Sequence, residues 1–167
     1  MPYLKRLPKF EYVSPRSLPE ICGLIAGTTP EEVLLLAGGT DAILQMRRRE
    51  RVPRRVIGLK GAADLEFVRE QADGSLAIGA MTTLQTLLSA PIVSQRYDLL
   101  RETAAQIGGH ELRNVATVGG NIAGALPCAD LPPALMTLGA RIRLSSRRGD
   151  RWVPLEEFFP EFGRTVA

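Results

Sequence analysis

Two pairs of adjacent glycines, each followed by polar residues, constrain the fold of this chain most strongly. The first pair lies in AGGTD at residues 37–41, directly after an apolar run at residues 32–37 that is typical of a buried strand. The next residues predict a helix over 42–48 and a second strand over 54–58. Strand, glycine loop, helix and strand in this order predict a compact βαβ unit.

The residues around this unit predict a mixture of helices and short strands, an α+β chain. Residues 1–16 read as extended, and Ser17 with Pro19 predicts the start of a helix over 18–26 that ends at Gly27. We expect a hairpin of strands at 65–69 and 75–79, with Asp73-Gly74 in its turn. Helices are expected at 84–88, capped by Thr82 or Thr83, and at 97–107 and 131–138, with a glycine-rich segment at 108–124. A strand at 141–145 should then pair with a second strand at 152–153.

Composition excludes several functional classes. The chain has 167 residues, 45% hydrophobic and 23% charged, which fits one soluble domain or one built from two small lobes. A net charge of +3 does not by itself indicate nucleic acid. No apolar stretch approaches the roughly 20 residues that span a bilayer, and nothing reads as a signal peptide. Cys22 and Cys128 lie far apart, so we expect no metal site, no iron–sulfur cluster, and a cytoplasmic location.

The first glycine loop has the features of a phosphate-binding turn. Glycines after a strand allow backbone to approach a ligand, and a helix that begins at Thr40 or Asp41 directs free N–H groups and its positive dipole end the same way. The alternative is a strand-to-helix turn with Asp41 as a cap. The loop matches neither the GxGxxG fingerprint nor a Walker loop.

The second glycine pair lies in TVGGNIAG at residues 117–124, followed by Asp130. It places glycines beside a hydroxyl and an amide, and Asp130 could accept a hydrogen bond from a ribose hydroxyl. The alternative is a glycine-rich connection followed by a helix that Asp130 caps. Taken together, the two segments suggest a phosphate clamped from two sides.

These segments carry a specific resemblance. AGGTDAI at 37–43 and TVGGNIAGALPCADLPPAL at 117–135 resemble the FAD-binding (medium) subunit of molybdenum hydroxylases, the xanthine dehydrogenase and carbon monoxide dehydrogenase family. FEY at 10–12, GAMTT at 79–83, Gly139-Ala140 and Phe158-Phe159 extend the resemblance along the chain. It implies the two-lobed α+β FAD-binding fold of the vanillyl-alcohol-oxidase/PCMH type. A small βαβ lobe would cover residues 1–60 and a larger mixed α/β lobe residues 61–167.

The resemblance also implies FAD as the cofactor and a set of residues that bind it. The first loop would line the pyrophosphate, the second would close on it, Asp130 would bind a cofactor hydroxyl, and Ile107 would pack on the adenosine half. The implied residues are Leu36, Ala37, Gly38, Gly39, Thr40, Asp41, Ile43, Ile107, Thr117, Val118, Gly119, Gly120, Asn121 and Asp130.

By the same resemblance, the chain would transfer electrons. They would come from a molybdopterin-containing large subunit through the [2Fe–2S] clusters of a small subunit to FAD, and then pass to an external acceptor. No catalytic acid, base or nucleophile is expected in this chain. Two alternatives stay open: a stand-alone flavin oxidoreductase of the same fold, and a non-catalytic, truncated assembly module.

Three other features carry lesser expectations. The family continues into a C-terminal domain, so we expect a fragment whose aromatic cluster of Phe158, Phe159 and Phe162 is loosely ordered or drives oligomerisation. His110 is expected to hydrogen-bond within a loop, and Cys128 to be a small packing residue. The arginines at 47–51 read as a solvated helix end or as a docking face for a partner subunit.

Overall fold

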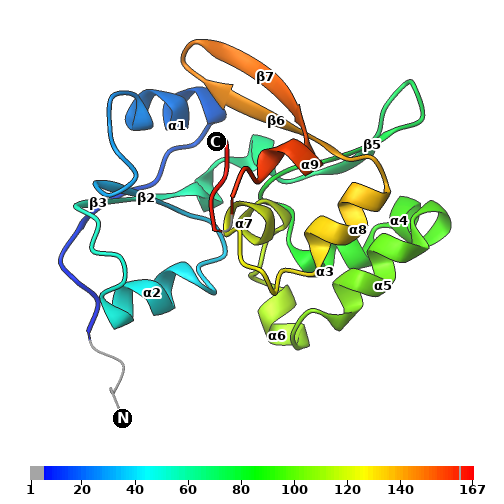
Figure 1. Ribbon diagram of the computed structural model, residues 1–167, viewed down its shortest axis with the longest axis horizontal. Helices are drawn as coiled ribbons and strands as arrows, with labels where there is room; N and C mark the ends of the chain where they lie inside the picture. Colours follow the sequence, from blue (N-terminus) through cyan, green and yellow to red (C-terminus); the bar gives the residue numbers. More distant parts are fainter. Residues whose placement is uncertain (1–5, 162) are drawn as a thin grey trace.

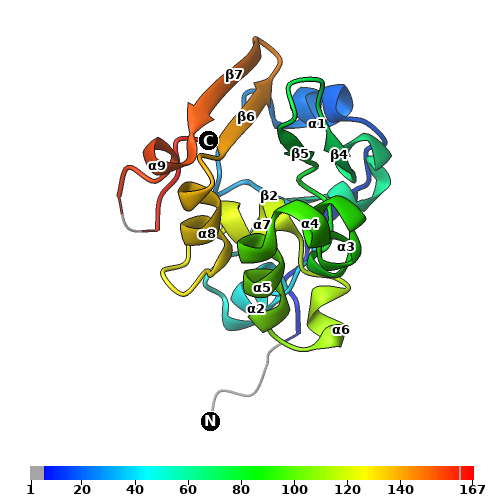
Figure 2. The same cartoon turned by 90° about the vertical axis from the view of Figure 1, so that its right-hand side faces the viewer.

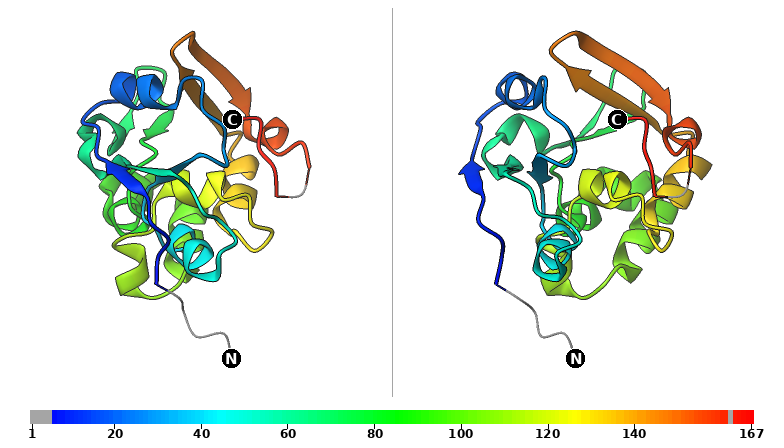
Figure 3. Two further views of the ribbon diagram at one scale, coloured as in Figure 1. Left: turned by 90° about the vertical axis from the view of Figure 1, so that its left-hand side faces the viewer. Right: turned by 60° about the vertical axis from the view of Figure 1, so that its left-hand side comes forward.

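The computed structural model describes residues 6–161 and 163–167 (Figure 1). The N-terminal part contains a parallel sheet of three strands in the order β1-β3-β2, with bounds Glu11–Val13 for β1, Val33–Leu36 for β2 and Arg55–Gly58 for β3. Helix α2 (Ala42–Arg48) connects β2 to β3, so the predicted βαβ unit is present. Helices α1 (Leu18–Ile25) and α2 lie on opposite sides of this sheet (Figure 3).

Local signals explain α1. The Ser17 side chain accepts a hydrogen bond from the Glu20 N–H, Pro19 lies in the first turn, and the chain turns at Gly27 with φ of +78°. The helix ends one residue before the predicted Ala26. Between α2 and the sheet, Leu34, Met46 and Val56 form a small hydrophobic cluster.

The remaining residues form a larger, mainly helical part with two antiparallel hairpins (Figure 2). Its elements are η1 (Leu59–Gly61), η2 (Ala63–Leu65), β4 (Val68–Glu70), β5 (Leu76–Ile78), α3 (Leu84–Ser89), α4 (Pro91–Arg96), α5 (Asp98–Gln106), α6 (His110–Arg113), α7 (Val118–Ala123), α8 (Leu131–Thr137), β6 (Arg141–Ser146), β7 (Gly149–Pro154) and α9 (Leu155–Phe158). Leu84, Leu87, Leu100, Leu131 and Leu155 are almost fully buried in its core.

Several expectations about this part need correction. The strand predicted at 65–69 begins only at Val68, because residues 63–65 form a short 3-10 helix. The glycine-rich segment at 108–124 contains α6 and α7, and α4 was not predicted. Phe158 is 2% exposed in the core, and its ring centroid lies 5.1 Å from that of Phe159 in an edge-to-face arrangement, so the expectation of a loosely ordered aromatic end is wrong for Phe158. Oligomerisation through this end stays a prediction, and Phe162 lies outside the described residues.

The small cluster and the large core fall on opposite sides of residue 60. This is consistent with two lobes, although the boundary itself stays a prediction. Among the helices that the structure describes, none has the length and apolar character needed to cross a membrane.

Candidate functional site

The two glycine loops lie against each other. A Cβ on Gly38 would lie 2.0 Å from the carbonyl oxygen of Val115, so only glycine allows this approach. A Cβ on Gly120 would lie 3.7 Å from the Cβ of Ala37. The structure therefore brings together the two segments that the sequence analysis predicted to share a ligand.

The first loop presents unpaired backbone donors. Between the end of β2 and the start of α2, the N–H groups of Gly38, Gly39, Thr40 and Asp41 donate to no atom of the described residues. Gly39 has φ of +77°, a left-handed conformation that favours glycine. Asp41 is at the N-cap position, but its side chain makes no capping hydrogen bond. Consecutive free N–H groups of this kind form a backbone site for an anion such as a pyrophosphate.

The second loop uses its donors differently. The N–H groups of Val118 and Gly119 donate to the carbonyl oxygens of Thr82 and Ala80, each at 2.9 Å. The N–H of Gly120 donates to the Thr117 hydroxyl at 3.1 Å. Backbone hydrogen bonds to Ala80 and Thr82 therefore hold the start of α7 against residues 80–83. A Cβ on Gly119 would lie 2.7 Å from the Cβ and from the carbonyl oxygen of Ala80, so glycine is required here for the contact with residues 79–83. Whether Gly119 also contacts a cofactor stays a prediction.

Asn121 supplies the polar feature of the second loop that remains unpaired. Its side-chain Oδ1 is buried and accepts no hydrogen bond within the described part of the chain. Buried acceptors of this kind nearly always have a donor. A hydroxyl or N–H of a bound molecule would satisfy this atom. The free donors of the first loop and this buried acceptor together fit a ligand that carries both phosphates and hydroxyls.

Asp130 and Ile107 lie on the side of α5 and α8. Asp130 precedes α8, but its exposed side chain makes no capping hydrogen bond, so the alternative that it is a helix cap is wrong. It lines a hollow of about 650 Å³ between α5 and α8, together with Gln106 and Cys128. Ile107 follows α5 directly and packs on the larger core. The Asp130 carboxylate is thus free to accept a hydrogen bond.

The remaining predicted residues flank the loops. A Cβ on Gly39 would lie 3.3 Å from Ile43 and 3.4 Å from Leu36, so these two apolar side chains border the first loop. Thr117 is buried and its hydroxyl caps α7. The sequence predicted no role for Ala80 and a possible role as a helix cap for Thr82, but Thr83 is the residue that caps α3. The carbonyl oxygens of Ala80 and Thr82 instead hold the second loop, and the GAMTT segment at 79–83 was the only sequence signal for this contact.

Three lesser expectations can also be compared with the structure. Cys128 is exposed, so its assignment as a packing residue is wrong. The imidazole of His110 makes no hydrogen bond within the described residues, so the expected role in a loop is not observed. The arginines follow the solvated-end interpretation: Arg47 and Arg48 lie in the last turn of α2, and the Arg49 side chain donates to the Met46 carbonyl at 3.1 Å.

Comparison with known proteins identifies the family. Residues 8–167 match the family described as the FAD binding domain in molybdopterin dehydrogenase. The chain belongs to this family. The predicted cofactor, FAD, and the predicted fold are thereby confirmed. Which individual residues contact the cofactor stays a prediction.

Individual relatives agree. The chain is 32% identical over 150 residues to the nicotinate dehydrogenase FAD-subunit of Eubacterium barkeri, covering 90% of this chain and 50% of the relative. It is 36% identical over 152 residues to the carbon monoxide dehydrogenase medium chain of Hydrogenophaga pseudoflava, covering 91% of this chain and 52% of the relative. The chain thus spans about half the length of these relatives.

Solved structures show the same fold. A chain of the carbon monoxide dehydrogenase of Hydrogenophaga pseudoflava matches with a TM-score of 0.92 at 34% identity. A chain of quinoline 2-oxidoreductase from Pseudomonas putida 86 matches with a TM-score of 0.91 at 28% identity. Each match covers 97% of this chain and 56% of the solved chain.

Proposed function

We propose that this chain is the FAD-binding part of an electron-transfer subunit in a molybdenum hydroxylase. Electrons from a molybdopterin-containing large subunit would pass through the [2Fe–2S] clusters of a small subunit to FAD, and then to an external acceptor. The observation that supports this best is the row of free N–H groups at residues 38–41, packed against a loop that carries the unpaired Asn121 acceptor.

The chain's own residues would bind and orient the cofactor. The N–H groups of residues 38–41 would hold the pyrophosphate, while Asn121 and Asp130 would accept hydrogen bonds from hydroxyl groups. Asp41 and Asp130 are the titratable side chains among the predicted site residues, and the proposal assigns neither of them a proton-transfer role. When bound, FAD itself supplies the redox chemistry, and the protein supplies its position and surroundings.

The relatives' names support the proposed partners. Several are called medium chains or medium subunits, including a nicotine 6-hydroxylase medium subunit from Paenarthrobacter nicotinovorans, which implies larger and smaller companions. We place the complex in the cytoplasm, since both cysteines are unpaired in the structure. No observation favours the stand-alone oxidoreductase or the assembly module.

The decisive experiment is isolation of the tagged protein from its native host under mild conditions. Flavin would be identified by its absorbance spectrum, and molybdenum and iron by elemental analysis of the same fractions. The proposal expects FAD, molybdenum and iron to elute together with two further polypeptides. Flavin without metals or partners would support the stand-alone oxidoreductase, and partners without flavin would support the assembly module.

A further inference from the structure

One side chain, Arg113, connects three helices beside the candidate site. It lies at the end of α6, and its Nη1 donates to the carbonyl oxygens of Ala105 at 3.0 Å, Ile107 at 3.3 Å and Gly108 at 2.8 Å. Its Nε reaches the side-chain oxygen of Gln85 on α3 at 3.5 Å. Arg113 therefore binds the end of α5 and the turn that carries Ile107.

Helix α6 in turn determines the position of the second loop. The N–H groups of Val115 and Ala116 both donate to the carbonyl oxygen of Leu112, at 3.0 and 2.8 Å. The Ala116 carbonyl accepts from the Leu84 N–H at 2.9 Å. The Val115 carbonyl is the group that packs against Gly38. A shift of α6 would thus move the surface on which the first loop rests.

We propose that Arg113 is a positioning residue for the cofactor site, an inference that rests on the proposed FAD-binding function. It fixes Ile107 on one side of α6 and the Val115–Gly38 contact on the other. Within the described residues its side-chain hydrogen bonds go to Gln85 and residues 105–108 and to neither glycine loop, so its influence on the cofactor passes through the backbone that it holds.

Arginine suits this role for two reasons. The last carbonyls of a helix have no partner within the helix, and a cation there also interacts favourably with the helix dipole. A guanidinium holds several N–H donors in one rigid plane, so Nη1 can face the three carbonyls while Nε faces Gln85. Lysine keeps the charge but lacks a second nitrogen for Gln85, and methionine lacks both the charge and the donors.

The test compares Arg113→Met and Arg113→Lys with the unchanged protein. Arg51→Met serves as the control, because the Arg51 side chain also donates to one backbone carbonyl, that of Pro30, but belongs to the segment after α2. The FAD dissociation constant would be measured by flavin fluorescence, at a temperature where circular dichroism shows every variant fully folded. Hydrogen exchange would be followed at the amides of Leu84 and residues 112–117.

We expect Arg113→Met to weaken FAD binding about tenfold or more, on the scale of lost hydrogen bonds to a charged group. Arg113→Lys should lie between this variant and the unchanged protein, and Arg51→Met should bind FAD normally. Exchange at Leu84 and residues 112–117 should accelerate only in the Arg113 variants. If Arg113→Met does not fold, the FAD dissociation constant and the hydrogen exchange of Arg113→Lys decide whether Arg113 positions the site.

Normal FAD affinity in a folded Arg113→Met protein, or an equal loss in Arg51→Met, would overturn the inference. These results differ from a failure of the proposed function. In that case the unchanged protein would not bind FAD, and hydrogen exchange in the FAD-free protein would still decide whether Arg113 positions residues 112–117.

Discussion

Asn121 is the residue whose surroundings point most directly to a bound molecule. Because its buried Oδ1 has no donor among the described residues, Asn121→Ala should leave the stability of the FAD-free protein unchanged or raise it by up to about 1 kcal/mol. The same change should weaken FAD binding by about 0.5–1.5 kcal/mol, the value of one hydrogen bond. Thermal melting without FAD and a flavin titration measure the two effects.

Ser94 provides a control outside residues 112–117, because its hydroxyl donates to the Pro91 carbonyl within α4 at 2.9 Å. Ser94→Ala should change stability slightly and leave FAD affinity unchanged. The assignment of Asn121 to the site would be contradicted if its variant were destabilised without FAD but bound FAD normally.

A change at Asp130 should likewise affect FAD binding but not the stability of the FAD-free protein. Since its carboxylate makes no capping hydrogen bond, Asp130→Ala should change the stability of the FAD-free protein by less than about 0.5 kcal/mol. It should weaken FAD binding by about 1–3 kcal/mol, on the scale of a hydrogen bond to a charged group. Isothermal titration calorimetry with FAD checks this. Full affinity in the variant would remove Asp130 from the predicted site.

Gly38 should be required for packing between the loops. Gly38→Ala would place a methyl group on the Val115 backbone, which cannot move away like a flexible side chain, so we expect a loss of about 1–3 kcal/mol in stability. Gly23→Ala is the opposite case, because nothing lies within 4 Å of a Cβ there and the residue lies in α1. It should gain about 0.4–1 kcal/mol. Urea denaturation of both variants measures these changes. The account would be refuted if Gly38→Ala raised the free energy of unfolding and Gly23→Ala lowered it.

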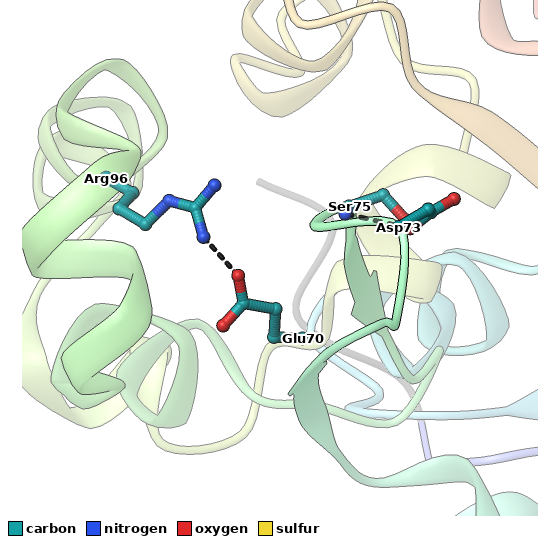
Figure 4. A network of polar contacts seen from close by, with 4 residues as sticks. All are labelled: Glu70, Asp73, Ser75 and Arg96. Atoms are coloured by element: carbon teal, nitrogen blue, oxygen red, sulfur yellow. Dashed lines mark hydrogen bonds and ion pairs between the residues drawn. The ribbon is translucent and has the colours of Figure 1, made fainter.

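At the scale of elements, the β4–β5 hairpin contains a carboxylate that responds to pH (Figure 4). Asp73 accepts hydrogen bonds from the Ser75 hydroxyl at 2.6 Å and the Ser75 N–H at 2.9 Å, and these bonds lower its pKa. Glu70 forms an ion pair with Arg96 and so links β4 to α4. The lowered pKa means that the charged form of Asp73 favours the folded turn.

The pH dependence follows from this direction. The stabilising contribution of Asp73 is complete above the ordinary aspartate pKa of about 3.9 and is lost as the pH falls through the lower pKa of the folded state. An NMR titration of the Ser75 amide should therefore show a midpoint below about 3.9. Asp73→Asn should abolish that transition. A midpoint at or above the ordinary value would show that the turn does not favour the charged form.

The elements differ in how far the sequence could predict them. The start of α1 depends on Ser17 and Pro19, and the βαβ unit on a local alternation of apolar run and glycine loop, so both were predictable. Helix α7 could not be predicted, because glycine is a poor helix former and the helix begins where distant carbonyls of Ala80 and Thr82 accept hydrogen bonds from its first residues.

Part of the candidate site could likewise be predicted from the sequence and part could not. Its glycine loops could be recognised from residue types, and their mutual contact was a reasonable inference. The different roles of the two loops could not be read from the sequence, since one presents free donors and the other is bound to residues 80–83. The role of Arg113 depends on hydrogen bonds to Gln85 and to residues 105–108, two segments that are separate in sequence, and no local pattern marks it.

For the molecule as a whole, the candidate site connects the two hydrophobic clusters. The first loop extends from the sheet whose cluster contains Leu34 and Val56, while the second loop belongs to the larger core through Val118. The loops meet where Gly38 lies against the Val115 carbonyl and Gly120 lies near Ala37. A ligand held by both loops would add contacts across this junction, so it should stabilise the two parts together.

FAD should therefore raise the melting temperature of the whole chain in one transition. A ligand that binds only the folded state at 100 times its dissociation constant contributes about 2.7 kcal/mol. At about 2–4 °C per kcal/mol for a chain of this size, the expected rise is roughly 5–11 °C. Differential scanning calorimetry at increasing FAD concentrations measures it, with riboflavin, which lacks the pyrophosphate, as the control.

We expect little stabilisation by riboflavin, because the free N–H groups at residues 38–41 would have no phosphate to bind. Equal stabilisation by both compounds would show that these groups do not hold the pyrophosphate. Two transitions, of which FAD moved only one, would show that the ligand does not join the two parts.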